Sequence, residues 1–212
     1  RACHGQPIFW GGAEAFPDAE KKKFLSPRLR KKFAGRTSWE VIAPIRARFE
    51  ACAWETSALN WMTYLDLNLR LPELLLMRVD KMSMAASIEA RVPFLDHHFV
   101  RQALAIPSAL KTRGGDLKHI LKLAVRGLIP DKIIDRRKQG FAVPIEDWIT
   151  GRLGESALET LNTFARETDF LDPEMIRNLS PEKSPRQIWY LLNFALWWNA
   201  YIKPSDKLDG KT

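Results

Sequence analysis

Apolar residues recur at helical spacing through much of this chain, and few segments alternate as β-strands do. The two clearest apolar stripes are Val41, Ile42, Ile45 and Phe49, and Leu117, Ile120, Leu121, Ala124 and Val125. Spacings of three and four residues place such side chains on one face of a helix. Residues 8–10 are β-prone but short, and the sequence has no internal repeat. The sequence therefore predicts a mainly α fold.

Prolines, a glycine and one capping aspartate predict where several helices begin and end. The segment from Ala58 to Met77 is rich in Leu and Met, and Pro72 is expected to restart a helix at its first turn. Asp96 is a good N-cap for a helix that is stopped by Pro107. The helix that carries the second stripe should end at Gly127.

The C-terminal third of the chain predicts three or four more helices. A short one is expected over Pro144–Ile149, and another begins at Pro173. Loose helical spacing also relates Leu153, Leu158, Leu161 and Phe164. A long helix that begins at Pro185 is apolar nearly all round, so it should lie in the core or against a missing partner. Its aromatic residues fit a core better than a cofactor site.

Length and composition set the scale of the fold. The chain has 212 residues, of which 46% are hydrophobic and 10% aromatic. This suffices for one domain with a core, or for a domain plus an appendage. We expect one domain portion over residues 1–202 and a frayed tail over residues 203–212. No apolar run reaches the ~18 residues of a membrane span, so no membrane association is expected.

The N-terminus and the cysteines indicate the cellular setting. The chain begins with Arg1 rather than Met and lacks the apolar segment of a signal peptide. We therefore expect the interior of a longer protein. Cys3 and Cys52 are too few for a disulfide framework and fit a reducing cytoplasm.

Positive charge is concentrated in three clusters. The net charge is +8, and much of the excess lies in Lys21–Lys23, Arg28–Lys32 and Arg136–Lys138. Such clusters can attract nucleic acid or a phosphorylated small molecule. For the first two, a solvated basic face is the simpler interpretation. A basic helical module that binds nucleic acid or an acidic partner through these two clusters remains the alternative function.

The segment Asp80–Asp96 is the first that could carry chemistry. It places Glu89 and Arg91 two residues apart in an apolar stretch closed by Pro93. A buried charge is costly unless it is paired or used. Together with Lys81, these side chains either satisfy one another or face a cleft. From residue types alone, an ordinary buried ion pair between Glu89 and Arg91 is the simpler of the two readings.

Two further segments combine glycine with basic residues. In Lys111–Lys118, a Gly-Gly pair between basic residues could wrap a phosphate. The simpler alternative is a loop that enters a helix, with Asp116 as the cap and Lys118 exposed. In Arg136–Pro144, Gly140 permits an unusual turn, and Phe141 and Trp148 can anchor the loop.

An anchored loop would hold Lys138 in one place. A fixed ammonium group suits the stabilisation of charge on a transferring phosphoryl group. A surface basic turn explains the same residues equally well. The sequence offers no metal site, because His4, His97, His98 and His119 lack ligand spacing. It also lacks a Gly-x-x-x-x-Gly-Lys-[Ser/Thr] loop and a Ser-Gly-Gly-x-Asp-Ser run.

Three sequence elements, in this order, resemble the C-terminal synthetase domain of the glutamine-dependent asparagine synthetase family. The resemblance covers roughly Phe9 to Trp198 and is strongest from Leu65 to Trp148. The matching elements are Asp80–Ala85 with Glu89–Asp96, Leu110–Lys111 with Lys118, and Leu128–Asp131 with Arg136–Pro144 and Trp148. Several motifs in one order are far more specific than any single motif.

The resemblance implies a fold and a reaction. The fold would be the helical C-terminal part of an α/β domain of the ATP-pyrophosphatase type, also described as adenine nucleotide α-hydrolase-like. ATP would convert a carboxylate to an acyl-adenylate, and ammonia from glutamine would then give an amide and AMP. The implied cofactors are ATP and Mg²⁺, held mainly by upstream residues. The implied partners are a carboxylate substrate and an N-terminal glutaminase domain, in a cytoplasmic ligase of asparagine biosynthesis.

The resemblance also implies roles for individual residues. Lys138 matches a lysine that stabilises charge on the phosphate during adenylation, and Glu89 matches an acidic residue that supports catalysis. Arg91 would orient Glu89 or a substrate carboxylate. The residues expected around the substrate or behind the site are Asp80, Lys81, Ser83, Lys118 and Gly140.

Departures from the family pattern are also informative. The pyrophosphate loop and a Gly-Glu-Gly-x-Asp-Glu segment are absent, and we expect both upstream of Arg1. This fragment alone should then be inactive. The start, Gln6–Phe16, differs from the commonest family pattern. It suggests a divergent amidotransferase branch, which leaves the substrate open between free aspartate and another carboxylate. Nucleic acid is not expected as a partner, and a homodimer remains open.

Overall fold

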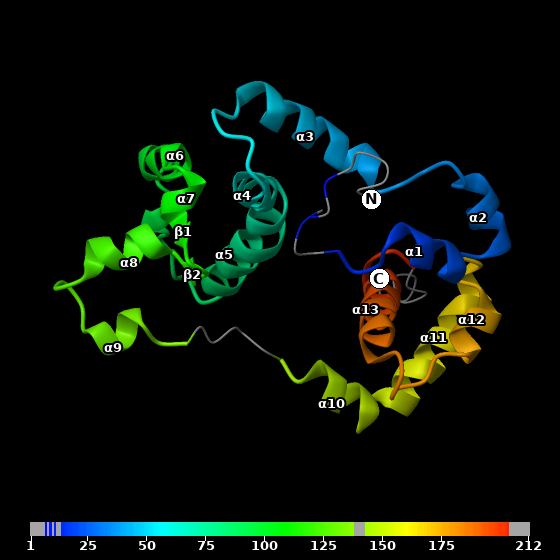
Figure 1. The fold of residues 1–212 in the computed structure, drawn as a ribbon. Coiled ribbons are helices and arrows are strands. Elements are labelled where there is room, and N and C mark those ends of the chain that lie inside the picture. The colour runs from blue at the N-terminus through cyan, green and yellow to red at the C-terminus, as the bar shows by residue number, and fades with distance from the viewer. Residues whose placement is uncertain (1–6, 8, 10, 12–13, 138–142, 204–212) are drawn as a thin grey trace, which may run out of the picture. The chain divides into compact units, whose positions relative to one another are not determined.

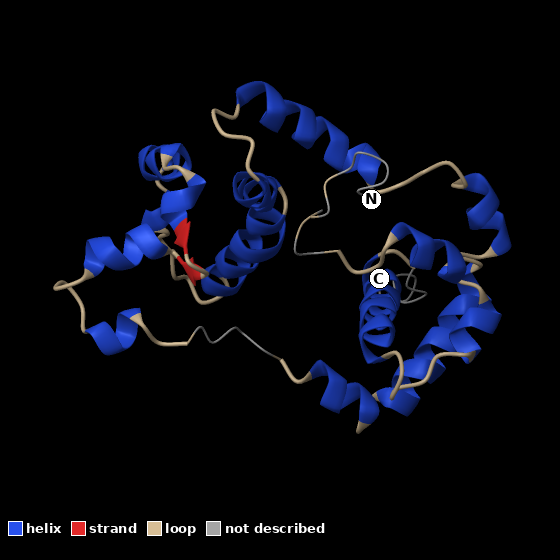
Figure 2. Ribbon diagram, in the orientation of Figure 1, coloured by secondary structure: helices blue, strands red, loops and turns tan. Residues whose placement is uncertain are grey.

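The computed structural model describes residues 7, 9, 11, 14–137 and 143–203. The chain divides into two compact units, which are described separately. Unit 1 comprises Arg1–Glu14 and Ser38–Gln139, and unit 2 comprises Ala15–Thr37 and Gly140–Thr212. Within the described ranges both units are built from helices, with one short β-hairpin (Figure 2). The prediction of a mainly α fold is confirmed.

Unit 1 consists of short helices joined by tight connections (Figure 1). Its elements are α3 (Trp39–Cys52), α4 (Ala58–Asn68), a π-helical turn (Leu71–Leu76), α5 (Met77–Met84), a 3₁₀ turn (Pro93–Leu95), α6 (His97–Ala105), α7 (Ser108–Lys111), β1 (Thr112–Arg113), β2 (Asp116–Leu117), α8 (His119–Val125) and α9 (Asp131–Ile134). The two strands pair antiparallel, with Thr112 opposite Leu117 and Arg113 opposite Asp116.

The core of unit 1 lies between α3 and α4. Its buried side chains are Ile42, Ile45, Phe49, Trp61 and Leu65. The first three belong to the apolar stripe that the sequence predicts, whereas Val41, its fourth member, is 62% exposed. Most of the predicted stripe is therefore the face that α3 buries. Trp61 is also fixed by polarity, because its indole Nε1 donates a hydrogen bond to the carbonyl oxygen of Phe9 at 2.9 Å.

The remainder of unit 1, from Leu71 to Asp135, has almost no core. Ile134 is the one buried side chain in this described stretch. Large apolar side chains here are exposed, among them Met82 (75%), Phe94 (66%) and Leu128 (78%). Burial of such groups is the main favourable term in folding. The helices of this stretch therefore depend on caps, turns and polar contacts more than α3 and α4 do.

Unit 2 contains six helices in its described residues (Figure 1). They are α1 (Asp18–Phe24), α2 (Pro27–Lys32), α10 (Ile145–Thr150), α11 (Gly154–Thr168), α12 (Pro173–Arg177) and α13 (Pro185–Tyr201). Most of its core side chains come from α11 and α13: Ala157, Leu161, Phe164, Ala165, Ile188, Leu191, Leu192 and Ala195. One face of α13 is buried, whereas Leu196, Trp197 and Tyr201 are exposed.

Two close contacts hold the shorter helices of unit 2 in place. Ser26 is fully buried, and its hydroxyl oxygen accepts from the backbone nitrogen of Leu29 as the cap of α2. Its own backbone nitrogen donates to the carbonyl of Phe170 at 2.9 Å, joining this turn to the C-terminal helices. Gly154 begins α11 where a Cβ atom would lie 2.4 Å from the carbonyl oxygen of Ile149, so a larger residue does not fit.

Most predicted helix boundaries are confirmed. Asp96 caps α6 through hydrogen bonds from the backbone nitrogens of His98 and Phe99, at 3.0 and 3.1 Å. Gly127 follows α8 with a φ of +80°, and Pro185 begins α13. One expectation is wrong, because Leu117 lies in β2 rather than in α8. The helices α1, α2, α5, α7 and α9 were not predicted from the sequence.

Candidate functional site

The Asp80–Asp96 segment leaves α5 through a tight turn. The Ser83 hydroxyl donates to the carbonyl oxygen of Asp80 at 3.2 Å, and the Ser83 carbonyl accepts from the backbone nitrogens of Ala86 and Ile88. Ser87 has a φ of +56°, which is unusual for a residue with a Cβ atom. Asp80 and Lys81 are exposed on α5. The structure therefore assigns Ser83 a local role in shaping this turn.

Glu89 and Arg91 form an exposed ion pair. Their closest atoms, Arg91 Nε and Glu89 Oε1, lie 3.0 Å apart, and a second hydrogen bond joins Nη2 to Oε2 at 3.1 Å. The Arg91 side chain is 82% exposed and the Glu89 side chain is 69% exposed. The expectation of a buried pair is wrong, because none of the described residues of unit 1 packs over this segment. Both groups are available to a ligand from solvent.

The Gly-Gly pair of Lys111–Lys118 forms the turn of the β1–β2 hairpin. Gly114 and Gly115 have φ values of +57° and +84°, which fit a two-residue turn with positive φ at both central positions. The pair therefore has a structural role that the sequence alternatives did not include. Lys118 is exposed, as the simpler alternative predicted.

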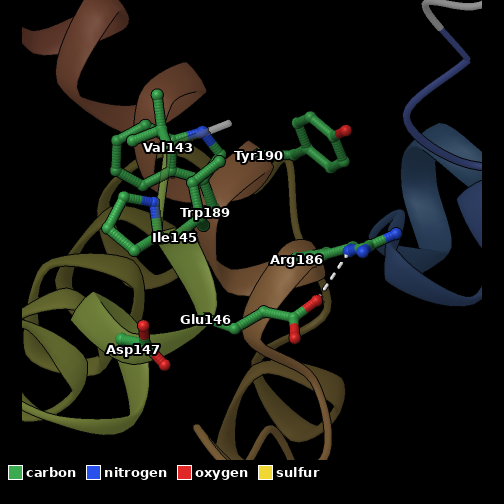
Figure 3. Close-up of a pocket in the computed structure, with 8 residues that line it drawn as sticks. Val143, Ile145, Glu146, Asp147, Arg186, Trp189 and Tyr190 are labelled. Carbon is green, nitrogen blue, oxygen red and sulfur yellow. Dashed lines mark hydrogen bonds and ion pairs between the residues drawn. The ribbon is translucent and has the colours of Figure 1, made fainter. Parts of the chain in front are cut away.

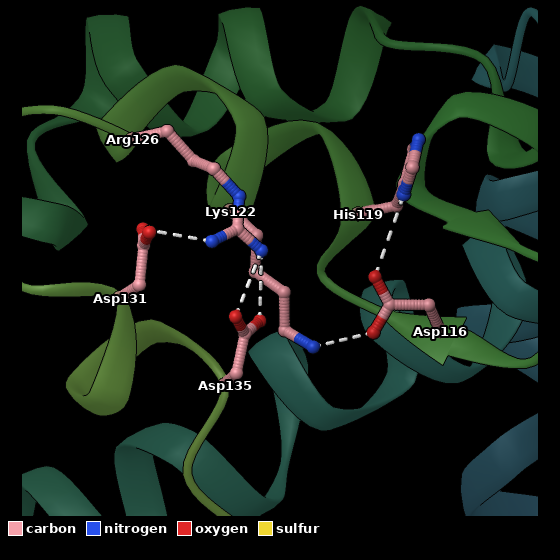
Figure 4. Close-up of polar contacts among 6 residues, drawn as sticks. All are labelled: Asp116, His119, Lys122, Arg126, Asp131 and Asp135. Carbon is pink, nitrogen blue, oxygen red and sulfur yellow. Dashed lines mark hydrogen bonds and ion pairs between the residues drawn. The ribbon is translucent and has the colours of Figure 1, made fainter.

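Asp116 does not cap α8, contrary to that alternative. The residue at the N-cap is Lys118, without a side-chain cap. The Asp116 carboxylate instead accepts a hydrogen bond from Lys122 and lies 3.4 Å from Nδ1 of His119 (Figure 4). The hydrogen bond from the Lys122 ammonium holds the pKa of Asp116 below its usual range. This pairing fixes the hairpin to the first turns of α8.

A polar network that the sequence analysis missed joins α4 to α7. The Glu55 carboxylate accepts hydrogen bonds from the hydroxyl and from the backbone nitrogen of Ser108, the latter at 2.9 Å. The buried Asn60 donates to Glu55 Oε2 at 3.3 Å and accepts from Lys111 Nζ at 2.9 Å. Lys111 also donates to the carbonyl of Leu104 at 3.3 Å. Lys111 is thus bound within unit 1 rather than presented to a phosphate.

The network surrounds part of a small cavity and perturbs two ionisable groups. The cavity has a volume of about 140 Å³, and it is lined by Phe49, Cys52, Ala53, Trp54, Glu55, Asn60, Tyr64 and Leu104. Hydrogen bonds from Ser108 lower the pKa of the Glu55 carboxyl. Burial lowers the pKa of the Lys111 ammonium, while the Glu55 carboxylate acts in the opposite direction. Every polar member has a partner, which is typical of a structural brace.

We expect Glu55→Gln to lower thermal stability at neutral pH but not in acid. Because the folded-state pKa of Glu55 lies below the usual value near 4.5, the carboxylate stabilises the fold above that value. The contribution is lost as the pH falls through the folded pKa. The melting-temperature gap between wild type and variant should therefore close as the pH falls below 4.5 and through the lowered pKa of the folded state. Exposed Glu73→Gln is the matched control. A gap that stays constant with pH would contradict this role.

The third predicted segment is described only in part. Arg136 and Arg137 are exposed. Lys138, Gly140 and Phe141 lie outside the described residues. The description resumes at Val143, which lines a pocket of about 460 Å³ in unit 2 with Pro144, Ile145, Glu146, Asp147, Arg186, Trp189 and Tyr190 (Figure 3). Arg186 Nε lies 3.0 Å from Glu146 Oε1 at this pocket.

Trp148 belongs to the same region of unit 2. It is 42% exposed, and its ring centroid lies 6.2 Å from that of Trp189. Trp148 therefore makes a tilted ring contact with α13. The expected anchoring of the loop by Phe141 and Trp148 stays a prediction, because residues 138–142 lie outside the described residues. The pocket has the size of a small-molecule site and presents both signs of charge.

The described residues do not by themselves form a nucleotide or metal site. No group of three or more His, Cys, Asp or Glu side chains in the described ranges could hold a metal ion. The sequence has no phosphate-binding glycine loop of the two types sought. In the same ranges, no helix is long and apolar enough to cross a membrane.

Most of the chain, including all the site residues described above, matches a known family in sequence. The asparagine synthase family model matches residues 7–199. The chain belongs to this family.

Curated relatives support the match. "Asparagine synthetase [glutamine-hydrolyzing] 1" of Bacillus subtilis is 29% identical over 208 residues, covering 93% of this chain and 31% of the relative. A "Putative asparagine synthetase [glutamine-hydrolyzing]" of Mycobacterium tuberculosis is 30% identical over 204 residues, covering 93% of this chain and 30% of the relative. The human asparagine synthetase is 36% identical over 69 residues, covering 31% of this chain and 12% of the relative. No solved structure matches significantly. The chain thus spans about 31% of the length of its first-named relative.

Proposed function

We propose that this chain is the helical part of an ATP-dependent ligase that amidates a carboxylate with ammonia from glutamine. The family match over residues 7–199 carries the proposal, because it includes all three sequence elements in their order. The relatives named above are glutamine-hydrolysing asparagine synthetases. Their shared length with this chain supports the same class of reaction here.

The proposed reaction has two steps. A carboxylate oxygen of the substrate attacks the α-phosphorus of ATP, and pyrophosphate leaves, which gives an acyl-adenylate. Ammonia then attacks the acyl carbon, and AMP leaves with the bond electrons as the amide forms. We propose aspartate or another carboxylate as substrate. We also propose that residues outside this chain bind Mg²⁺ and form the phosphate-binding loop of an α/β ATP-pyrophosphatase-type fold.

We propose that Lys138 stabilises negative charge at the phosphate during adenylation, and that Glu89 acts at the same site. The exposure of Glu89 and Arg91 supports their availability to a substrate. Asp80, Lys81 and Lys118 are exposed on the same unit. Their exposure is consistent with the proposal that they lie around the substrate or behind the catalytic residues. Ser83 contributes through the turn at the end of α5. Gly140 stays a proposed site residue, because glycine permits backbone conformations that other residues rarely adopt.

The wider setting follows from the same proposal. A glutaminase domain would deliver ammonia, and the enzyme would work in the cytoplasm. A homodimer is an open proposal. The domain extent of residues 1–202, with a tail over residues 203–212, stays a prediction.

The test is product analysis of the protein expressed from its complete coding sequence. With ATP, glutamine and aspartate, or with a panel of other carboxylic acids, we expect AMP and pyrophosphate to form in equal amounts with the amide. Ammonium salts should replace glutamine, because ammonia is the attacking species. Formation of ADP, or no nucleotide turnover with any acid and ammonia, would overturn the proposal.

The structure gives little support to a nucleic-acid-binding module. Arg28 pairs with Asp169 at 2.6 Å, Arg30 with Asp172 at 3.1 Å, and Lys21 with Asp18 at 2.5 Å. These pairs neutralise part of the two N-terminal basic clusters. Titration with RNA at low and moderate salt decides this alternative, since phosphate contacts give a steep salt dependence.

The role of Glu89 can be separated from a structural one. Glu89→Gln should leave the melting temperature nearly unchanged, because exposed ion pairs contribute about 0–1 kcal/mol, and the side chain is 69% exposed. If Glu89 acts at the site, AMP formation should fall while binding of ATP persists. Glu159→Gln, on exposed α11 surface, is the matched control. A large loss of stability with full activity in the folded fraction would contradict the catalytic role.

A further inference from the structure

A guanidinium group holds two carboxylates at the turn between α8 and α9. Arg126 Nη1 donates to Asp131 Oδ1 at 2.8 Å. Its Nη2 donates to both oxygens of Asp135, each at 2.9 Å (Figure 4). The chain between α8 and α9 turns at Gly127, whose φ is +80°. The turn brings Arg126 back against both ends of α9.

The electrostatics of this cluster favour a fixed arrangement. Asp131 and Asp135 are four residues apart on one helical face, where like charges repel. Arg126 lies between them, and the hydrogen bonds that it donates to Asp135 and then to Asp131 raise its pKa. The planar guanidinium suits carboxylate pairing of this kind better than an ammonium does. The cluster therefore needs Arg126 rather than positive charge alone.

Asp135 stands immediately before the basic run Arg136–Arg137. Both arginines are exposed, and neither has an ion-pair partner among the described residues. This chain shows what happens when an acid lies two residues from an arginine without another partner: Glu89 and Arg91 pair with each other at 3.0 Å. A released Asp135 carboxylate would have the same option with Arg137. Occupation of both Asp135 oxygens by Arg126 prevents that pairing.

We propose that Arg126 is a positioning residue that binds Asp135 and thereby keeps Arg136 and Arg137 unpaired and directed from a fixed helix end toward a phosphate-bearing substrate. This role rests on the proposed function, in which a polyphosphate binds near this run. It differs from a stabilising role, because the three side chains are 42%, 71% and 53% exposed in the order Arg126, Asp131 and Asp135. Exposed pairs add little to stability.

The test is the dissociation constant of ATP, measured by calorimetry on the complete protein, together with KM and kcat for AMP formation. Arg126→Gln should weaken ATP binding and raise its KM by about five- to tenfold, the effect of one charge pair in contact across water. The kcat should change less. The melting temperature should stay close to that of wild type.

A second substitution separates positioning from structure. In the Arg126→Gln background, Asp135→Asn removes the carboxylate that would otherwise pair with Arg136 or Arg137. The double variant should therefore recover most of the ATP affinity, whereas a merely structural role predicts no recovery or a further loss. Arg126→Lys should retain only part of the ATP affinity that Arg126→Gln loses, since an ammonium group lacks the planar fork of a guanidinium. Arg28→Gln with Asp169→Asn, an exposed pair in unit 2, is the matched control.

The outcomes distinguish this role from the proposed function. Unchanged ATP affinity in Arg126→Gln, in a protein that makes AMP normally, overturns the positioning role and leaves the function intact. ATP binding that follows the expected pattern without any AMP formation overturns the function and supports the role. A wild-type protein that does not bind ATP overturns both.

Discussion

Replacement of Lys138 by alanine is expected to lower glutamine-dependent AMP formation by about two powers of ten or more. Removal of one preorganised group that stabilises developing charge costs about a hundredfold to a thousandfold in other enzymes. Lys138 directly follows Arg136–Arg137 in the sequence, so it belongs to a basic run that begins at the fixed end of α9. The effect should appear in kcat, because the charge on the phosphate grows in the transition state.

The measurement is steady-state release of AMP and pyrophosphate by the complete protein at saturating ATP. Lys132→Ala is the matched control, since Lys132 is an exposed lysine on α9 itself. Glutamine hydrolysis, followed separately, should continue in both variants if it takes place in another domain. Undiminished AMP formation by the Lys138 variant would remove this residue from the proposed mechanism, while the family membership of the chain would stand.

Leu161→Ala is expected to destabilise unit 2 by about 2–5 kcal/mol, the range for deletion of a buried leucine side chain. Leu161 is fully buried on α11, in the cluster that α11 and α13 share. Truncation leaves a cavity in a close-packed region as well as removing apolar contact. Leu196→Ala on α13 is the matched control, because that leucine is 52% exposed; its loss should be below about 1 kcal/mol.

Native-state hydrogen exchange of peptides from α11 and α13 measures this effect in the complete protein. It reports the free energy of local opening, so unfolding of other domains does not mask the result. Protection of both helices should fall together in Leu161→Ala. Equal losses in the two variants, or a loss confined to α11, would contradict a core shared by the two helices.

The sequence by itself determined the longer helices and several of their ends. A helix is held by hydrogen bonds between residues four apart, and its caps are set by neighbours within one turn. Asp96 before α6, Gly127 after α8 and Pro185 at the start of α13 are signals of this local kind. The order of short motifs also determined the family, which the comparison over residues 7–199 confirms.

The tertiary structure decided which charged groups are exposed and which pair. Glu89 and Arg91 were expected to be buried, because their neighbours in sequence are apolar. They are exposed because burial depends on what packs over a segment, and no part of unit 1 that the structure describes covers this one. Neighbouring residue types carry no information about that.

Contacts between distant residues were likewise invisible in the sequence. Glu55 and Ser108 are 53 residues apart, yet they form the centre of the network that binds Lys111. Arg126 and Asp135 are closer, but their pairing depends on the turn at Gly127 and on α9, which the sequence did not predict. Local backbone preferences therefore fixed the helices, whereas the folded arrangement of the chain chose the partners of its charged side chains.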